Sequence, residues 1–272
     1  MENTTLMQGL DPEMMEPIVS RRDAIAKGAF ASSKVMAALA LGSVPIALGA
    51  LARDVYGQTP ADVLDVLQFA LLLEYLEGEF YTRGVAGAGL IPAADLVVFT
   101  QIRDHENVHI TALQGLIRGR GATPGAKPNF DFTAKGALPG FNFTGTAQYP
   151  PFMALAQAFE DTGVRAYKGQ APRLMGDKAI LTAALTIHSV EARHASQVRR
   201  MRGQKGWITG NSRGDLPAFT QGIYNGEDLA MQAGLDITAL GTGNGGIGAV
   251  TEAFDEPLTK AQVTAIVTPF LA

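Results

Sequence analysis

Two glutamate–histidine pairs form the clearest chemical pattern in this sequence. Glu106 and His109 stand three residues apart, and Glu191 and His194 repeat that spacing 85 residues later. On an α-helix, residues three apart share one face with about 5–6 Å between their Cβ atoms, so both side chains can reach one metal ion. The chain has only 4 histidines, which makes this repetition difficult to attribute to chance.

A glutamate in an apolar segment precedes each pair. Glu74 lies in FALLLEYL and Glu160 follows MALAQAF, and the next glutamate of each half comes 32 and 31 residues later. An unpaired carboxylate is costly in such surroundings, and metal coordination is the simplest compensation. Four glutamates and two histidines suffice to hold two ions with bridging carboxylates. Because iron and manganese both accept oxygen and nitrogen ligands, we predict two Fe or Mn ions. The alternative is a polar network that no longer binds metal.

Further candidates lie close to these ligands in the sequence. Glu77 comes three residues after Glu74 and could be a seventh metal ligand or a solvated or hydrogen-bonded acid. Tyr81 and Tyr167 each follow a first glutamate by seven residues, near the same face and about 10 Å along the axis. They could serve a catalytic site as hydrogen-bond donors or electron relays, or could simply pack. His105 points about 100° away from Glu106, and we expect it to be structural.

The two halves of the repeat differ at positions next to the ligands. Glu77 aligns with Gly163, and Tyr75 aligns with Asp161. An additional carboxylate beside one ion favours its higher oxidation state. We therefore expect two non-equivalent ions, with more open coordination and higher reactivity for the ion nearest Gly163.

Four helical segments are predicted to position these residues. The first begins at Thr59-Pro60, with a capping residue followed by proline at the first helical position, and fades at 84–89. The others begin near Pro92, at Pro150-Pro151 and near Asp177, and the last ends at Gly203. The links within the first two and the last two helices are short, which makes each pair an antiparallel hairpin. Some thirty residues rich in Gly, Pro and Phe (120–149) connect the hairpins. This all-α order, with one long crossover, is that of a ferritin-like four-helix bundle.

The regions on either side of the bundle have a different character. We divide the chain into an N-terminal segment (1–58), the bundle (59–206) and an irregular C-terminal cover (207–272). In the cover, Thr259 with Gln262 predicts a capping box and a short last helix through Val267. In the N-terminal segment, Arg21-Arg22 precedes an Ala/Gly-rich apolar stretch, which is similar to a twin-arginine export signal. We expect a periplasmic or extracellular protein, and a cytoplasmic one if the segment instead belongs to the fold or to an assembly.

Composition excludes several classes of site. The chain has no cysteine, so disulfides, zinc–thiolate sites and iron–sulfur clusters are excluded. The net charge is −4 with scattered Lys and Arg, and we expect no nucleic-acid partner.

The chain resembles the ferritin-like proteins related to plant desiccation-induced proteins and their bacterial relatives. The resemblance rests on LEYLEGEFY (73–81), the two Glu-x-x-His motifs and the tail FDEPLTKAQVTAIVTPF (254–270), and it extends from Thr59 to the C-terminus. All six expected ligands are present, and the resemblance implies the fold more firmly than any reaction.

Two functions of different classes remain open. The first is an oxidoreductase acting on O2 or peroxide, with ferroxidase, peroxidase and manganese catalase-like activities all compatible with these ligands. The second is a structural or stress-protective protein that self-associates and uses the metal site for stability. We expect a homo-oligomer in either case, and the N-terminal segment offers a means of membrane association.

Overall fold

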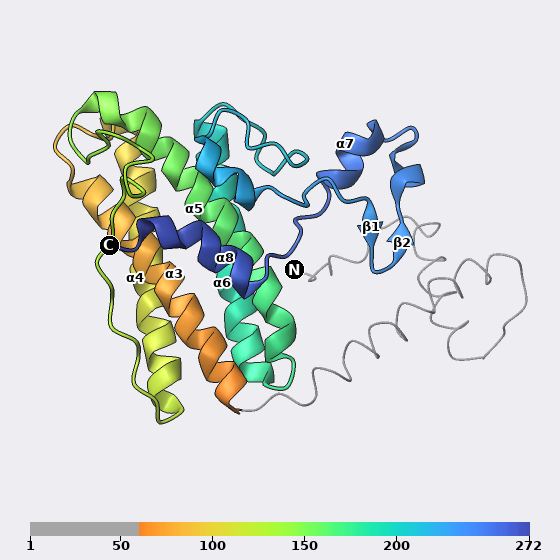
Figure 1. Ribbon diagram of the computed structural model, residues 1–272, viewed down its shortest axis with the longest axis horizontal. Helices are drawn as coiled ribbons and strands as arrows, with labels where there is room; N and C mark the ends of the chain where they lie inside the picture. The colour runs from red at the N-terminus through yellow and green to blue at the C-terminus, as the bar shows by residue number, and fades with distance from the viewer. Residues whose placement is uncertain (1–59) are drawn as a thin grey trace, which may run out of the picture. The chain divides into compact units, whose positions relative to one another are not determined.

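Four long helices form the centre of the protein. The computed structural model describes residues 60–272. The bundle comprises α3 (Pro60–Ala86), α4 (Ala93–Gly119), α5 (Tyr149–Gln170) and α6 (Lys178–Met201). α3 packs mainly along α4, and α5 mainly along α6 (Figure 1). The predicted all-α bundle of two helical hairpins is confirmed. The export and membrane-association predictions concern the N-terminal segment, which lies outside the described residues.

The long crossover runs from the end of α4 to the opposite end of the bundle, where a 3₁₀ turn, η1 (Thr146–Gln148), leads into α5 (Figure 1). Aromatic side chains fix it to the helices. The ring of Phe132 lies 5.4 Å from that of Phe80 on α3 and 6.2 Å from that of Phe159 on α5. Phe130 also forms a β-bridge with Leu271 near the C-terminus. The Phe-rich composition of this segment thus reflects its packing over the bundle.

The C-terminal cover is irregular, as predicted. Its elements are η3 (Ala218–Ile223), β1 (Met231–Gln232), β2 (Leu235–Asp236), η4 (Thr238–Gly241), α7 (Gly246–Thr251), α8 (Lys260–Val267) and η5 (Thr268–Phe270). β1 and β2 pair antiparallel. Thr259 and Gln262 form the predicted capping box, in which Gln262 N donates to Thr259 Oγ1 over 3.3 Å and Thr259 N donates to Gln262 Oε1 over 2.8 Å. None of the helices in residues 60–272 combines the length and apolar character required to cross a membrane.

Two buried arginines hold α5 against its neighbours. Arg199 of α6 binds both carboxylate oxygens of Asp161 on α5, at 2.8 and 2.6 Å. Arg165 of α5 is 1% exposed and pairs with Glu227 of the cover over 2.7 Å. Removing one member of a buried ion pair costs about 3–5 kcal/mol because the other charge is stranded. These pairs therefore fix the α5–α6 hairpin that presents half of the site.

One close approach between α5 and the cover gives a first testable prediction. A Cβ added to Gly169 would lie 1.9 Å from the backbone oxygen of Leu258. We expect Gly169→Ala to lower the free energy of unfolding by about 1–3 kcal/mol, the usual cost of forced overpacking. Gly115 is the matched control, since it is also helical and its added Cβ meets nothing within 4 Å. Gly115→Ala should stabilise by about 0.5–1 kcal/mol. Urea unfolding measures both, and equal effects would contradict the packing described.

Candidate metal centre

The bundle contains two overlapping groups of buried metal-ligating side chains. Glu74, Glu106, His109 and Glu191 form one group, and Glu106, Glu160, Glu191 and His194 form the other. Within each group, one potential ligand atom from every residue lies within 4.8 Å of the others. Glu106 and Glu191 belong to both groups. The structure therefore brings together six of the seven predicted metal ligands, and these two glutamates contribute to both groups.

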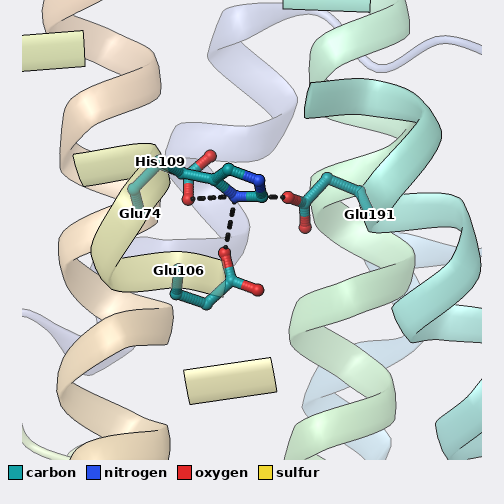
Figure 2. Close-up of side chains that lie close together, drawn as sticks. All are labelled: Glu74, Glu106, His109 and Glu191. Atoms are coloured by element: carbon teal, nitrogen blue, oxygen red, sulfur yellow. Dashed lines mark hydrogen bonds and ion pairs between the residues drawn. The ribbon is translucent and has the colours of Figure 1, made fainter. Parts of the chain in front are cut away.

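His109 lies at the meeting point of the first group. Its Nδ1 is 3.2 Å from Glu74 Oε2, 3.0 Å from Glu106 Oε2 and 3.2 Å from Glu191 Oε1 (Figure 2). The three carboxylates come from α3, α4 and α6. A cation can occupy this arrangement, because carboxylate oxygens can donate electron pairs and the imidazole nitrogen can do so once it has lost its proton.

The second group has close contacts that are not hydrogen bonds. His194 Nδ1 lies 2.8 Å from Glu106 Oε1 and 3.4 Å from Glu160 Oε2. All three atoms are buried and lack a hydrogen-bond partner, as do both oxygens of Glu191. Buried polar atoms without partners are rare and costly in folded proteins. Ligand atoms that converge without hydrogen-bond geometry fit a metal ion between them, and the donor set fits the group predicted from the sequence.

Burial and neighbouring charges shift the pKa values of the groups in the centre. Glu74, Glu106, Glu160 and Glu191 are all 0% exposed. Desolvation, with the charge of Glu106 and against the opposing hydrogen bond of His109, raises the pKa of Glu74 to about 7. Desolvation also opposes the charge on His109, but contacts with Glu106, Glu191 and Glu74 outweigh it and raise the pKa of His109 to about 12. The surrounding carboxylates therefore favour the charged form of this histidine at neutral pH.

The two predicted tyrosines bridge the halves of the bundle. Tyr81 of α3 donates to Glu160 Oε1 of α5 over 2.5 Å, and Tyr167 of α5 donates to Glu74 Oε1 of α3. Each hydroxyl thus holds one oxygen of a carboxylate whose other oxygen faces the centre. Burial, followed by the charge of that carboxylate, raises the pKa of both tyrosines well above the usual range. They remain protonated hydrogen-bond donors, and a catalytic role for them stays a prediction.

The reciprocal hydrogen bonds predict paired mutational effects. Tyr81→Phe should lower the affinity for the ion held by Glu160, and Tyr167→Phe should lower the affinity for the ion held by Glu74. Each change should be about 10–100-fold, because a ligand loses its orienting partner. Titration of Mn²⁺ into metal-free protein measures both changes. Tyr75→Phe is the control, since Tyr75 accepts from Gln114 and donates to the Gly125 carbonyl, away from the ligands. A Tyr75 variant that weakens binding as strongly would contradict this assignment.

Carboxylates occupy the space beside Gly163, and the expectation of a more open and more reactive ion there stays a prediction. A Cβ added to this glycine would lie 3.1 Å from Glu191 Oε2 and 3.3 Å from Glu77 Oε1. Two carboxylates therefore fill the space that the missing side chain leaves. Glu77 is buried, at 4% exposure, but belongs to neither four-residue group. Burial, followed by the charges of Glu191 and Glu160, raises its pKa well above the usual value. Its role as a seventh ligand stays a prediction.

One residue near the site makes a contact that the sequence did not reveal. Nδ1 of His105, a residue expected to be structural, lies 2.9 Å from Nε2 of the predicted ligand His194. The contact crosses from α4 to α6. Helical spacing alone places His105 off the face of Glu106. The face of α4 that carries His105 reaches His194 only because α4 packs against α6, a contact that joins the two hairpins.

A surface groove between α4 and α6 reaches the histidine side of the centre. His105, His109 and His194 line it together with Gln101, Arg193, Gln197 and four aliphatic side chains, and it encloses about 580 Å³ open to solvent. The carboxylates lie deeper in the bundle. A small molecule can thus approach the histidines without the helices separating.

Helix order, the long crossover and the shared glutamates all agree with one family. A sequence model described as a ferritin-like domain matches residues 62–204. The chain belongs to the ferritin-like domain family. In this ferritin-like chain, the matched range contains all seven predicted ligands and both tyrosines. The match does not distinguish subfamilies, so the resemblance to desiccation-related proteins stays a prediction. A comparison with curated proteins found no match.

Proposed function

We propose that this ferritin-like protein holds two Fe or Mn ions and uses them as an oxidoreductase on O2 or peroxide. A single observation carries the proposal: two four-ligand groups share Glu106 and Glu191, and both groups contain buried donor atoms without hydrogen-bond partners. Two ions that share bridging carboxylates lie close enough to act on one small molecule together.

The donor set narrows the choice of metal. It consists of carboxylate oxygens and imidazole nitrogens, and the chain has no cysteine. Oxygen and nitrogen donors of this kind suit iron and manganese, whereas thiolates would select softer metals. When bound, such ions supply electron transfer to O2 or peroxide.

The protein's own residues have separable roles in this proposal. Glu106 and Glu191 connect the two positions, while Glu74 with His109 and Glu160 with His194 complete one position each. Tyr81 and Tyr167 orient the terminal carboxylates. The groove between α4 and α6 gives a small substrate access to the histidine side, and the apolar packing of the bundle limits water at the carboxylate side.

A structural role is the second candidate. The four central glutamates are 0% exposed, so ions held there would also stabilise the bundle by balancing buried charge. A self-associating protective protein would need nothing more from the site than this stabilisation.

Turnover separates the two candidates. Metal-free protein is loaded separately with Fe²⁺ and Mn²⁺, and O2 consumption and peroxide removal are measured with each metal. The proposal expects repeated turnover with one of them, and loss of turnover in a Glu106→Gln variant. The matched control is Glu79→Gln on α3, because Glu79 pairs with Arg83 and Lys127 away from the centre. Stoichiometric binding without turnover, together with a large thermal stabilisation, would favour the structural role instead.

A further inference from the structure

Two histidines of the centre differ in what their second ring nitrogen contacts. His194 Nε2 lies 2.9 Å from Nδ1 of His105, and the planes of these rings are within 12° of each other. For His109, by contrast, the hydrogen bond and ion pairs found within residues 60–272 all involve Nδ1. Both ring nitrogens of His194 thus have a polar neighbour, through ion pairs at Nδ1 and the His105 contact at Nε2, whereas the contacts of His109 are all at Nδ1.

The difference has a clear origin in the sequence repeat. The second helices of the two halves align at an offset of 85 residues, which places Glu106 on Glu191 and His105 on Val190. Val190 lines the same groove but has no atom that can accept a hydrogen bond. The duplicated site therefore carries an orienting histidine in one half and an aliphatic side chain in the other.

We propose that His105 is a positioning residue that makes the metal position of Glu160 and His194 the tighter of the two. The inference rests on the proposed pair of ions. A histidine that binds a metal through Nδ1 carries its hydrogen on Nε2, and an acceptor for that hydrogen fixes the ring and increases the basicity of the ligand nitrogen. Nδ1 of His105 is placed to be this acceptor. Partners of this kind typically change metal affinity about 10–100-fold.

The half-buried situation of His105 makes the residue suitable for substitution. It lies at the wall of the groove, so a smaller side chain there leaves the helical core unchanged. His105→Val copies the Val190 side of the repeat. His105→Asn retains an acceptor oxygen at a similar distance along the side chain. Gln101→Val is the matched control, because Gln101 lines the same groove on the same helix.

Calorimetric titration of metal-free, full-length protein with Mn²⁺ tests the proposal. The unmodified protein should show two binding constants, and His105→Val should weaken the tighter one about 10–100-fold while the other stays unchanged. His105→Asn should restore most of the loss, and Gln101→Val should alter neither constant. Helix content from circular dichroism should be the same in all four proteins.

Several results would overturn the inference. If His105→Val leaves both constants unchanged, or if His105→Asn binds as poorly as His105→Val, His105 does not act through a hydrogen bond. These results would leave the proposed function intact, since two ions would still bind. If the unmodified protein takes up neither Mn²⁺ nor Fe²⁺, the proposed function fails and the inference fails with it.

Discussion

Replacing Glu106 and Glu191 together by glutamine is expected to reduce metal binding from two ions per chain to none at micromolar free metal. Both residues belong to both ligand groups, so the double variant removes two charged ligands from each position at once. Glutamine keeps the volume of the side chain but not its charge, and a divalent cation among neutral amides loses most of its attraction. Fe or Mn content after equilibrium dialysis measures the effect.

The same double variant should fold at least as well as the metal-free parent. Burial, followed by Glu106 and Glu74, raises the pKa of Glu191 well above its usual value, which shows that its charged form is poorly tolerated there. Neutral amides remove that cost, although the contact of Glu106 with His109 is weakened. Glu79→Gln serves as control and should bind two ions. Two ions retained by the double variant would contradict the bridging assignment.

Stabilisation by metal is expected to increase as the pH rises from 5 to 8. In the metal-free protein, the pKa of Glu74 is raised from 4.5 to about 7, so its contribution to stability is present below 4.5 and is lost as the pH rises to 7. The pKa of His109 is raised from 6.5 to about 12, so the contribution of His109 to stability is lost gradually above pH 6.5. The pKa of Glu106 is lowered to about 2, so the contribution of Glu106 to stability is lost only below pH 4.5, outside the window from pH 5 to 8. Stability of the metal-free form therefore falls across this window.

The stability of the metal-loaded form should instead benefit from a higher pH. Metal binds deprotonated ligands and displaces their protons, so each proton displaced increases affinity about tenfold per pH unit. At neutral pH His109 carries such a proton. Scanning calorimetry at pH 5.5, 6.5 and 7.5, with and without excess Mn²⁺, should show a difference in Tm that increases at each step. A difference that does not change with pH would show that binding displaces no protons and that the ligands are not the residues described.

Sequence reasoning located the ligands because their geometry is local. The spacing of Glu106 and His109 fixes two side chains on one helical face whatever the tertiary packing. The antiparallel hairpin then brings Glu74 to the same height. The internal repeat of the sequence predicted Glu160 and His194 in the same way. The structure places all of these residues in the two ligand groups.

Contacts between the two hairpins could not be obtained in this way. The partner of Tyr81 is Glu160 of the other hairpin, and the partner of His194 is His105. Both depend on how α3 meets α5 and how α4 meets α6, which spacing along one helix does not determine. The surroundings of Gly163 depend on the same contacts, because carboxylates of Glu77 on α3 and Glu191 on α6 fill the space that the missing side chain leaves.

Anomalous diffraction from crystals of the full-length protein, purified without chelators from cells supplied with iron and manganese, tests the central claim most directly. Difference maps calculated at the absorption edges of both metals should show two peaks. One should lie among Glu74, Glu106, His109 and Glu191, and the other among Glu106, Glu160, Glu191 and His194. The absence of a transition-metal peak among these six residues would contradict the account.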